Sequence, residues 1–257
     1  QYKGQFATDG TNWYYLDANS GVALTGFQSI NGKLYHFNEA GVQTKGNWAT
    51  QNDKWYYLNA KDGVALTGVQ VFDGHTYYFN EDGSQVKGNW ASPNSKDWYY
   101  LAAKDGVAVT GLQVINGALY YFNEDGKQVK GDFAESNGNW YYLDQNTGQA
   151  VTGPVYIDGV LNYFDENGVQ AKYRYEEIDG SWYYFDNKGH AVTGFQVIND
   201  KVQFFGRDGR QYKDMAVTMN DGSYRYFDND GNMVANTTKF INNRFVRFDN
   251  QGVGRVY

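Results

Sequence analysis

Short aromatic runs recur along the chain at a regular interval. Runs of the type WYYL begin at six positions that lie 42 or 43 residues apart, namely Trp13, Trp55, Trp98, Trp140, Trp182 and, in the degenerate form YRYF, Tyr224. A second set, of the type LYYF, begins about 21 residues after each of the first, at Leu34, Thr76, Leu119, Leu161 and Val202, with the related RFVRF around Phe245. Since a fixed period is the signature of a repeat protein, the spacing predicts a repeat unit of about 21 residues in two alternating forms.

Each repeat unit is predicted to be a β-hairpin. Aromatic runs favour extended backbone, and they are followed by turn sequences such as NEDG, DNKG and DENG. A second type of turn, INGK or FDGH, is predicted to join one hairpin to the next, and no stretch sustains a helical pattern. We therefore predict an all-β fold: a β-solenoid of about twelve stacked β-hairpins, with residues 1–257 as a single array of six repeats of about 42 residues and a degenerate C-terminal repeat.

A six-bladed β-propeller is the alternative fold, because a period near 42 residues with four strands also describes a propeller blade. The inner and outer hairpins of a blade lie in different surroundings, and nothing requires them to resemble each other. In this chain they do resemble each other, and the last repeat is eroded like the terminal unit of an open stack. These two observations favour the solenoid.

The second form of the hairpin predicts a face on which polar side chains surround an aromatic ring. A two-residue turn within NEDG would place Tyr78 opposite Gln85, so that Tyr78, Gln85 and Lys87 share one face. Tyr77 and Phe79 would then lie on the opposite, apolar face and pack on neighbouring hairpins. A slip of one residue would exchange the two faces.

Tyr78, Gln85 and Lys87 have the chemistry of a sugar-binding site. A tyrosine ring can lie against the C–H side of a pyranose, and Gln and Lys can hydrogen-bond the hydroxyl groups around it. The other interpretation is that Gln and Lys are only the solvated face of a strand. The equivalent trios are His36, Gln43 and Lys45; Tyr121, Gln128 and Lys130; and Tyr163, Gln170 and Lys172; the fifth copy has Phe204 with Gln211 and Lys213.

The first form of the hairpin is predicted to supply a second wall of the site. Trp55 and Tyr57 share a face, and on a similar pairing Ala65 and Thr67 lie on that face too, so that small side chains leave a ledge beside large rings. A sugar on Tyr57 could then reach the Gln and Lys of the next hairpin. The equivalents of Tyr57 are Tyr15, Tyr100 and Tyr142.

Composition restricts the ligand. Aromatic residues make up 18% of the chain, and the net charge is −7 at pH 7. Because nucleic-acid binding draws on clustered Lys and Arg, we expect a neutral ligand and no nucleic acid. The chain contains no Cys, which excludes disulfides, and no apolar run approaches the roughly 18 residues that a membrane span needs, so no membrane insertion is expected. No signal peptide is visible at the start, which indicates a mature, trimmed or partial chain.

No constellation of catalytic or metal-binding residues stands out. A glycosidase needs two carboxylates at a set separation, whereas the acidic residues here recur in turns with the period of the chain. His36, His75 and His190 fall at unrelated points, and the sequence DNDG at Asp228 lacks the further ligands of a calcium loop. We expect no enzyme activity, no cofactor and no metal.

The repeated sequence resembles the glucan-binding repeats, or YG repeats, of glucansucrases and dextran-binding lectins of lactic acid bacteria. The resemblance rests on AVTG-x-Q-x-I-N-G, YYF-x-x-D-G and Q-V-K-G, all found within Ala108–Gly131, and it covers essentially the whole chain. It implies a secreted or cell-surface β-solenoid that binds α-glucan polysaccharide or isomalto-oligosaccharide, dextran above all, through a stacking Tyr and a Q-x-K pair. It also implies two origins for the chain, a free lectin or a part of a larger glucansucrase.

Two features set limits on this resemblance. Gly254 and Val256 stand where the last copy should have Gln and Lys, so no working site is expected there. Choline-binding modules have similar repeats, but they need a cage of aromatic side chains for a quaternary ammonium, with a Gly-Trp step after Thr. Here that step is TGF, TGV or TGL, which weakens the choline alternative. A structural spacer or adhesion stalk is the remaining alternative.

Overall fold

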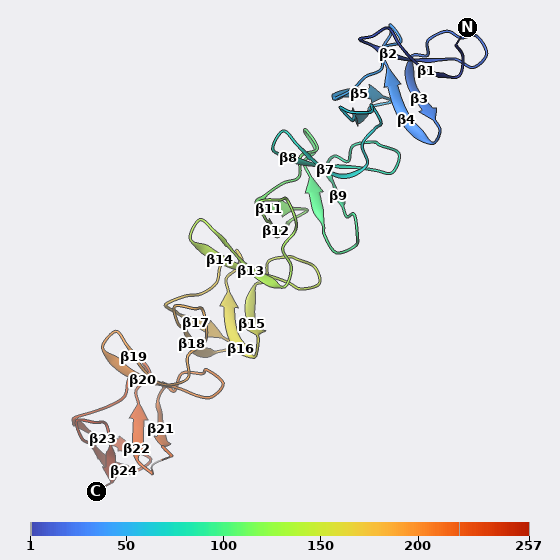
Figure 1. Cartoon of the computed structure of the whole chain (residues 1–257). Coiled ribbons are helices and arrows are strands. Elements are labelled where there is room, and N and C mark those ends of the chain that lie inside the picture. Colours follow the sequence, from blue (N-terminus) through green and yellow to red (C-terminus); the bar gives the residue numbers. More distant parts are fainter. Residues whose placement is uncertain (1, 221, 257) are drawn as a thin grey trace. The chain divides into compact units, whose positions relative to one another are not determined.

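The computed structural model describes residues 2–220 and 222–256, and these contain strands and turns but no helix. The prediction of an all-β chain of repeated hairpins is therefore confirmed (Figure 1). The strands are β1 (Gln5–Thr8), β2 (Trp13–Leu16), β3 (Gly26–Ile30), β4 (Lys33–Phe37), β5 (Asn47–Gln51), β6 (Lys54–Leu58), β7 (Gly68–Phe72), β8 (His75–Phe79), β9 (Asn89–Ala91), β10 (Tyr99–Leu101), β11 (Gly111–Ile115), β12 (Ala118–Phe122), β13 (Asp132–Ser136), β14 (Asn139–Leu143), β15 (Gly153–Ile157), β16 (Val160–Phe164), β17 (Arg174–Ile178), β18 (Ser181–Phe185), β19 (Gly194–Ile198), β20 (Lys201–Phe205), β21 (Met215–Thr218), β22 (Tyr224–Phe227), β23 (Thr237–Ile241), β24 (Arg244–Phe248) and β25 (Gly254–Val256).

The chain divides into two compact bodies. The first body comprises Gln1–Lys130 with Asn146–Gln149, and the second comprises Gly131–Gln145 with Ala150–Tyr257. From β1 to β24, each odd-numbered strand pairs antiparallel with the even-numbered strand that follows it. The pairs up to β20 form separate two-stranded sheets, whereas β21 to β25 form one five-stranded sheet. The propeller alternative is wrong, because its blades would need four strands in one sheet.

The turn inside many of the hairpins is the Asn-Gly or Asp-Gly turn, so the prediction that this turn links one hairpin to the next is wrong. In the β7–β8 hairpin, Phe72 pairs with His75, and the two residues between them, Asp73 and Gly74, have φ of 53° and 73°. Two consecutive positive φ values define the tight turn whose twist matches a hairpin. The strand pair is therefore built around FDGH and its relatives, and the NEDG turns lie after the hairpin.

A short return segment follows each hairpin and pairs with its second strand. After β8 the chain passes through Glu81–Gly83 and comes back with Gln85 opposite Phe79. The loop has three residues, closed by a hydrogen bond from the Asn80 N–H to the Ser84 carbonyl of 2.8 Å, and Gly83 takes the left-handed conformation with φ of 82°. The predicted two-residue turn omitted Gly83, so the predicted register was wrong by one residue.

Return segments also bind each hairpin to the one before it. The Gln85 N–H donates to the Trp55 carbonyl at 2.7 Å, and the Ala108 N–H donates to the Thr76 carbonyl at 2.8 Å. In the second body, the Gln170 N–H donates to the Trp140 carbonyl at 2.8 Å. Backbone hydrogen bonds thus run from these return segments to two hairpins, their own and the preceding one.

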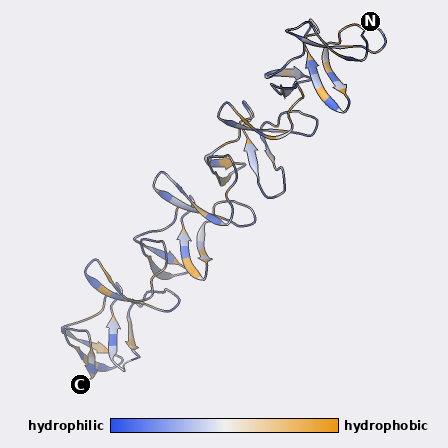
Figure 2. Ribbon diagram, in the orientation of Figure 1, coloured by the Kyte–Doolittle hydropathy of each residue, from blue (hydrophilic) through white to orange (hydrophobic). Residues whose placement is uncertain are grey.

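The core is divided into small clusters, one at each junction. The last residue of nearly every second strand is a Leu or Phe that is at most 1% exposed, such as Leu58, Phe79 and Leu101. One such cluster contains Ala91, Tyr99, Leu101 and Ala108. Hydrophobic and hydrophilic residues are therefore interspersed along the whole chain (Figure 2). No helix of the described residues is long and apolar enough to cross a membrane.

Gly106→Ala should destabilise the protein more than Gly111→Ala. Both glycines have positive φ, of 74° and 68°, but a Cβ at Gly106 would lie 2.3 Å from Nε2 of Gln85, whereas a Cβ at Gly111 meets nothing within 4 Å. Gly111→Ala should cost about 1–2 kcal/mol for the left-handed backbone alone. Gly106→Ala should cost about 1 kcal/mol more, because it displaces a hydrogen-bonded amide. Urea unfolding of both variants measures the difference.

The additional destabilisation by Gly106→Ala should disappear in a Gln85→Ala background, because that substitution removes the amide that the new methyl group displaces. A double-mutant cycle measures this coupling. Equal shifts for Gly106→Ala and Gly111→Ala in the parent would show that the Gln85 contact does not constrain the turn.

Candidate functional site

The predicted trio of Tyr78, Gln85 and Lys87 does not share a face. Because Gln85 pairs with Phe79, Tyr78 pairs with Val86 and points to the other side of the strand. Tyr78 and Val86 pack together against the cluster around Tyr99 of the next hairpin. The same offset holds in the other copies, where the carbonyls of His36, Tyr121 and Tyr163 accept hydrogen bonds from the N–H groups of Thr44, Val129 and Ala171.

Aromatic side chains of the predicted trios in second-form hairpins pack against other side chains of the protein. His36 packs on Phe27, with 4.7 Å between ring centroids, and its Nδ1 lies 2.8 Å from Oγ1 of Thr44. Tyr163 lies 6.1 Å from the ring of Phe185. Of the predicted second-form aromatics, His36, Tyr78 and Tyr163 thus pack against side chains other than the Gln and Lys of their trios.

The ledge predicted beside Tyr57 is also absent. Ala65 pairs with Leu58, so it lies on the face opposite Tyr57, and both Ala65 and Leu58 belong to a buried cluster. Trp55 and Tyr57 do share a face, as predicted, and the ring of Tyr57 lies 5.1 Å from that of Trp48. Phe72 stacks on Tyr57 at 4.3 Å with an interplanar angle of 23°. A ring of the protein thus covers the surface that a sugar was predicted to use.

The equivalents of Tyr57 make the same kind of contact with the aromatic residue of the first strand. Tyr15 lies 5.0 Å from Phe6, Tyr100 lies 5.3 Å from Trp90, and Tyr142 lies 5.0 Å from Phe133, all edge to face. The hydroxyl groups of Tyr15 and Tyr100 donate to the carbonyls of Gly4 and Gly88. Such contacts indicate a mainly structural role for these tyrosines.

Gln85 and Lys87 instead meet Trp55, the first residue of the preceding WYYL run. The backbone of Gln85 is bonded to the carbonyl of Trp55, and the Lys87 ammonium lies 4.9 Å from the centre of the Trp55 ring, which is 43% exposed. The pairing recurs in every copy with a Q-x-K sequence. The distances from Nζ to the ring centre are 5.4 Å for Lys45 and Trp13, 5.8 Å for Lys130 and Trp98, 4.6 Å for Lys172 and Trp140 and 5.2 Å for Lys213 and Trp182. We call each set of Trp, Gln and Lys a tryptophan site.

The tryptophans were not among the predicted site residues. The signal that could have identified them is the nearly constant separation in sequence between each Trp and its Lys, which parallels the separation between Trp and Gln. Counting Gly83 as a loop residue would have placed the side chains of Gln85 and Lys87 beside Trp55.

The glutamine amide holds the turn of the next repeat unit. Nε2 of Gln85 donates to the Asp105 carbonyl at 2.8 Å, immediately before Gly106. The equivalent bonds run from Gln43 to Asp62 at 2.9 Å, from Gln128 to Thr147 at 3.1 Å, from Gln170 to Lys188 at 3.1 Å and from Gln211 to Asp230 at 3.3 Å. The amide is thereby fixed in orientation, and its Oε1 is the atom that can accept a hydrogen bond from a ligand.

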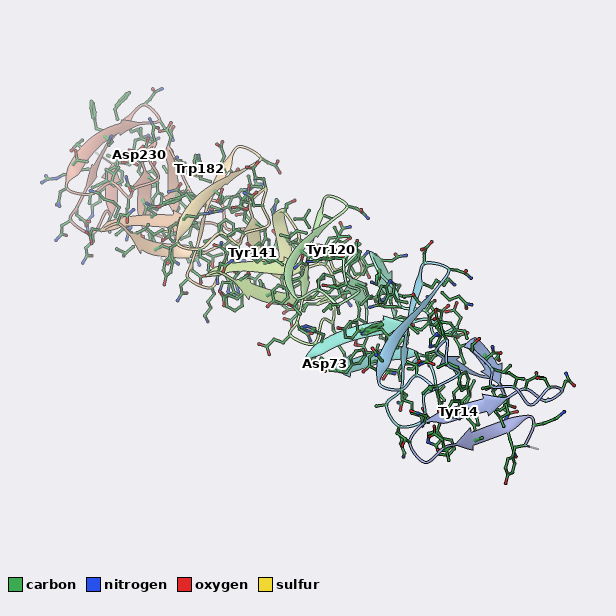
Figure 3. All side chains as sticks on the ribbon, turned by 90° about the horizontal axis from the view of Figure 1, so that it is seen from above. Tyr14, Asp73, Tyr120, Tyr141, Trp182 and Asp230 are labelled. Carbon is green, nitrogen blue, oxygen red and sulfur yellow. The ribbon has the colours of Figure 1, made fainter. Side chains whose placement is uncertain are left out.

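Pockets open at tryptophan sites in both bodies. In the first body, Trp55, Gln85 and Lys87 line a pocket of about 350 Å³ together with Asp82 and Ser84. In the second body, a pocket of about 350 Å³ is lined by Trp182, Gln211, Lys213 and Asp230 among others. Trp182 and Asp230 are labelled in Figure 3. This volume lies at the lower end of the range for small-ligand sites. A larger hollow of about 1090 Å³ in the last hairpins is lined by Arg247 and Arg255 among others.

One wall of the tryptophan site differs between copies. Tyr77 lies on the same face as Gln85, and Tyr35 and Tyr120 are its equivalents in the first body. Burial, followed by the nearby Asp105 and Asp73, raises the pKa of the Tyr77 phenol, which is therefore a neutral donor at pH 7. In the second body an amide replaces the phenol: Asn162 accepts from Gln170 at 2.8 Å, and Gln203 accepts from Gln211 at 2.7 Å.

Hairpins of the second form lack a tryptophan site. Leu34 stands at the position of Trp55, and the Ala65 N–H donates to its carbonyl at 2.8 Å. Leu34 packs against the cluster that contains Ala65, so this junction is closed by apolar side chains. Thr67 stands where the other form has Lys87. A site therefore occurs once in every two hairpins.

No group of metal-ligating side chains occurs in the described part of the chain. Asp228, at the start of the DNDG sequence, uses Oδ1 to accept hydrogen bonds from the N–H groups of Asp230 and Asn232, at 3.0 and 2.8 Å. The acidic side chain thus closes a turn, as Asp and Asn commonly do.

Repeated hairpins with one exposed ring-and-amide site at every second junction define a repeat binding module. The model of the choline-binding repeat matches residues 24–67, 66–109, 109–154, 151–191 and 192–237, and that of the putative cell wall binding repeat matches residues 4–23. These matches cover most of the chain, so it belongs to the choline-binding repeat family. No curated protein sequence matches it.

Several solved structures are similar. CbpJ from Streptococcus pneumoniae TIGR4 is 22% identical with a TM-score of 0.62, and the match covers 98% of this chain and 99% of that one. Choline binding protein F from Streptococcus pneumoniae is also 22% identical, with a TM-score of 0.59 and coverage of 99% of both chains. Alternansucrase in complex with isomaltononaose is 32% identical over 92% of this chain, with a TM-score of 0.39, and this chain spans 19% of its length. The first two show that the fold is shared.

Asp82→Asn should destabilise the protein at neutral pH and have less effect in acid. The hydroxyl and N–H groups of Ser84, with the ammonium of Lys54, lower the pKa of Asp82 from 3.8 to about 2. A carboxylate with a lowered folded-state pKa contributes stability above pH 3.8, and this contribution is lost as the pH falls towards 2. Because the Asp82 side chain is 52% exposed, we expect less than about 1 kcal/mol at pH 7.

Urea unfolding between pH 2 and pH 7 would measure this effect. Asp125→Asn is the matched control, since Lys127 stands there in place of Ser84. A destabilisation by Asp82→Asn that is the same at both ends of the range would contradict the assignment.

Proposed function

We propose that the chain is a non-catalytic module that binds α-glucan of the dextran type, in which glucose is α-1,6-linked, at its tryptophan sites. The proposal is supported chiefly by one observation: an indole ring with a fixed amide and an ammonium beside it recurs five times. The ring is exposed in four of these copies and half-buried at Trp98. An indole ring can cover the C–H side of a glucose residue. The lysine and the glutamine Oε1 then provide donors and an acceptor for the hydroxyl groups around it.

The contact between lysine and tryptophan does not prevent this mode of binding. A cation over an exposed ring contributes about 0.5–1 kcal/mol, whereas a hydrogen bond to a charged group contributes about 1.5–3 kcal/mol. Lys87 can therefore leave the ring of Trp55 for a sugar hydroxyl without a net loss. The ring face that it vacates is the surface on which the sugar would stack.

Weak binding at each site is compatible with firm retention of a polymer. We propose that residues 1–257 act as one array of six repeats of about 42 residues, of which the last lacks a site because Gly254 and Val256 replace Gln and Lys. A long α-glucan that reaches several sites gains effective concentration at each further one. This use also suits a secreted or cell-surface module, either as a free lectin or as part of a larger glucansucrase.

Binding of a quaternary ammonium such as choline is the second candidate function. Family membership favours it, and so does the attraction that each tryptophan ring already shows for a cation. The lysine ammonium also opposes choline binding, because it already lies over the ring and would repel a second cation. If neither ligand binds, the chain is a structural spacer or stalk.

Trp55→Ala and Lys87→Ala should each weaken binding at one site. With isomaltotriose in calorimetry, Trp55→Ala should lose one site of the parent's total, and Lys87→Ala should weaken that site about tenfold, the equivalent of about 1.4 kcal/mol. Both variants should also be retarded less than the parent in dextran-containing gels. Val71→Ala, at a position that is 71% exposed and outside the site, is the matched control.

Thermal unfolding would verify that the variants are folded. A parent protein that dextran does not retard, or a Trp55→Ala variant that keeps every site, would disprove the proposed function at this site.

A further inference from the structure

A lysine ammonium lies over the tryptophan ring at each of the five tryptophan sites. The distances from Nζ to the ring centre are between 4.6 and 5.8 Å, within the range of a cation–π contact. The five copies include sites in both bodies, and they agree although their neighbouring side chains differ. The pairing is therefore a property of the repeat.

The lysine is held at the ring from a second side. Nζ of Lys130 donates to the Asn146 carbonyl at 3.1 Å, and Nζ of Lys45 donates to the Lys61 carbonyl at 3.4 Å. Both carbonyls belong to the turn of the next repeat unit, the same turn that the glutamine amide holds. The five lysines are also partly buried. At Lys45 and Lys130 the position of the ammonium is thus set by the ring on one side and by a backbone carbonyl on the other.

The lysine occurs only where there is a tryptophan. At the junctions without a tryptophan site, the position of Lys87 is taken by Thr67 or Thr110, and the position of Trp55 is taken by Leu34 or Thr76. A lysine kept merely for solubility would not need to follow the ring. The alternation links the charge to the exposed indole.

We infer that these lysines are specificity-determining residues, which exclude quaternary ammonium ligands from the tryptophan rings and reserve the rings for neutral, hydroxyl-bearing ligands. The identity of the neutral ligand, an α-glucan, rests on the proposed function. An aromatic face attracts any cation of suitable size, and here the protein supplies that cation itself. A second cation at the same ring would meet a like charge at close range, whereas a sugar hydroxyl would accept a hydrogen bond from the same ammonium.

The test is a gain of choline binding when the lysine is removed. The variants are Lys87→Met, and a variant with the same change at Lys45, Lys87, Lys130, Lys172 and Lys213, each in the full chain. Tryptophan fluorescence and calorimetry with choline chloride, against sodium chloride at equal ionic strength, would measure binding. We expect choline to bind the five-site variant roughly tenfold or more tightly than the parent.

Lys54→Met is the matched control, because Lys54 lines the same pocket but is paired with Asp82 at 3.0 Å rather than placed over the ring. It should show no gain of choline binding. Lys87→Thr, which installs the residue of the other hairpin form, serves as a second variant if Met disturbs folding.

Choline binding that is no tighter in Lys87→Met, Lys87→Thr and the five-site variant than in the parent would overturn the inference, as would an equal gain in Lys54→Met. Dextran retardation of the parent separates this result from the proposed function. A retarded parent without any gain of choline binding leaves glucan binding intact and rejects the role of the lysine. An unretarded parent with a gain keeps the role of the lysine and rejects glucan binding.

Discussion

Within each body, the arrangement depends on the backbone hydrogen bond between a return segment and the preceding hairpin. A two-stranded hairpin alone is marginally stable in water, and the hairpins of this chain bury only small clusters. The Gln85 N–H bond to the Trp55 carbonyl, at 2.7 Å, fixes one hairpin on the next and places the side chains of both at a common junction. Stability and site geometry therefore come from the same contact.

This contact explains why Gln serves structure and binding together. Its backbone holds the preceding hairpin, and its Nε2 holds the turn of the following one through the Asp105 carbonyl at 2.8 Å. The close approach requires Gly106, since any Cβ there would occupy the position of the amide. A side chain fixed in this way presents its Oε1 at a defined place beside Trp55, at little further cost in conformational entropy when a ligand binds.

The sequence was sufficient to predict the repeat and its hairpins, but not the register that places the side chains at the candidate site. The aromatic runs and the Asn-Gly and Asp-Gly turns identify hairpins by propensity alone. The register of the return segment depends on whether Gly83 is counted as loop or strand, and both counts satisfy the same pattern of residues. Because side chains alternate along a strand, that single residue moved Gln85 and Lys87 from Tyr78 to Trp55.

In the proposed binding mode, the choice of ligand depends on the side chain that lies over the tryptophan ring, because the ring face is the surface on which the ligand would stack. The fold is shared with two pneumococcal choline-binding proteins, and in this chain a tryptophan stands at five of the junctions. Under the inference drawn above, the residue two positions after the glutamine, here Lys87, decides whether that ring admits a cation, because the return segment brings its ammonium to the ring. One side chain per junction is enough to change the electrostatic character of the site, while the backbone contacts that build the junction remain the same.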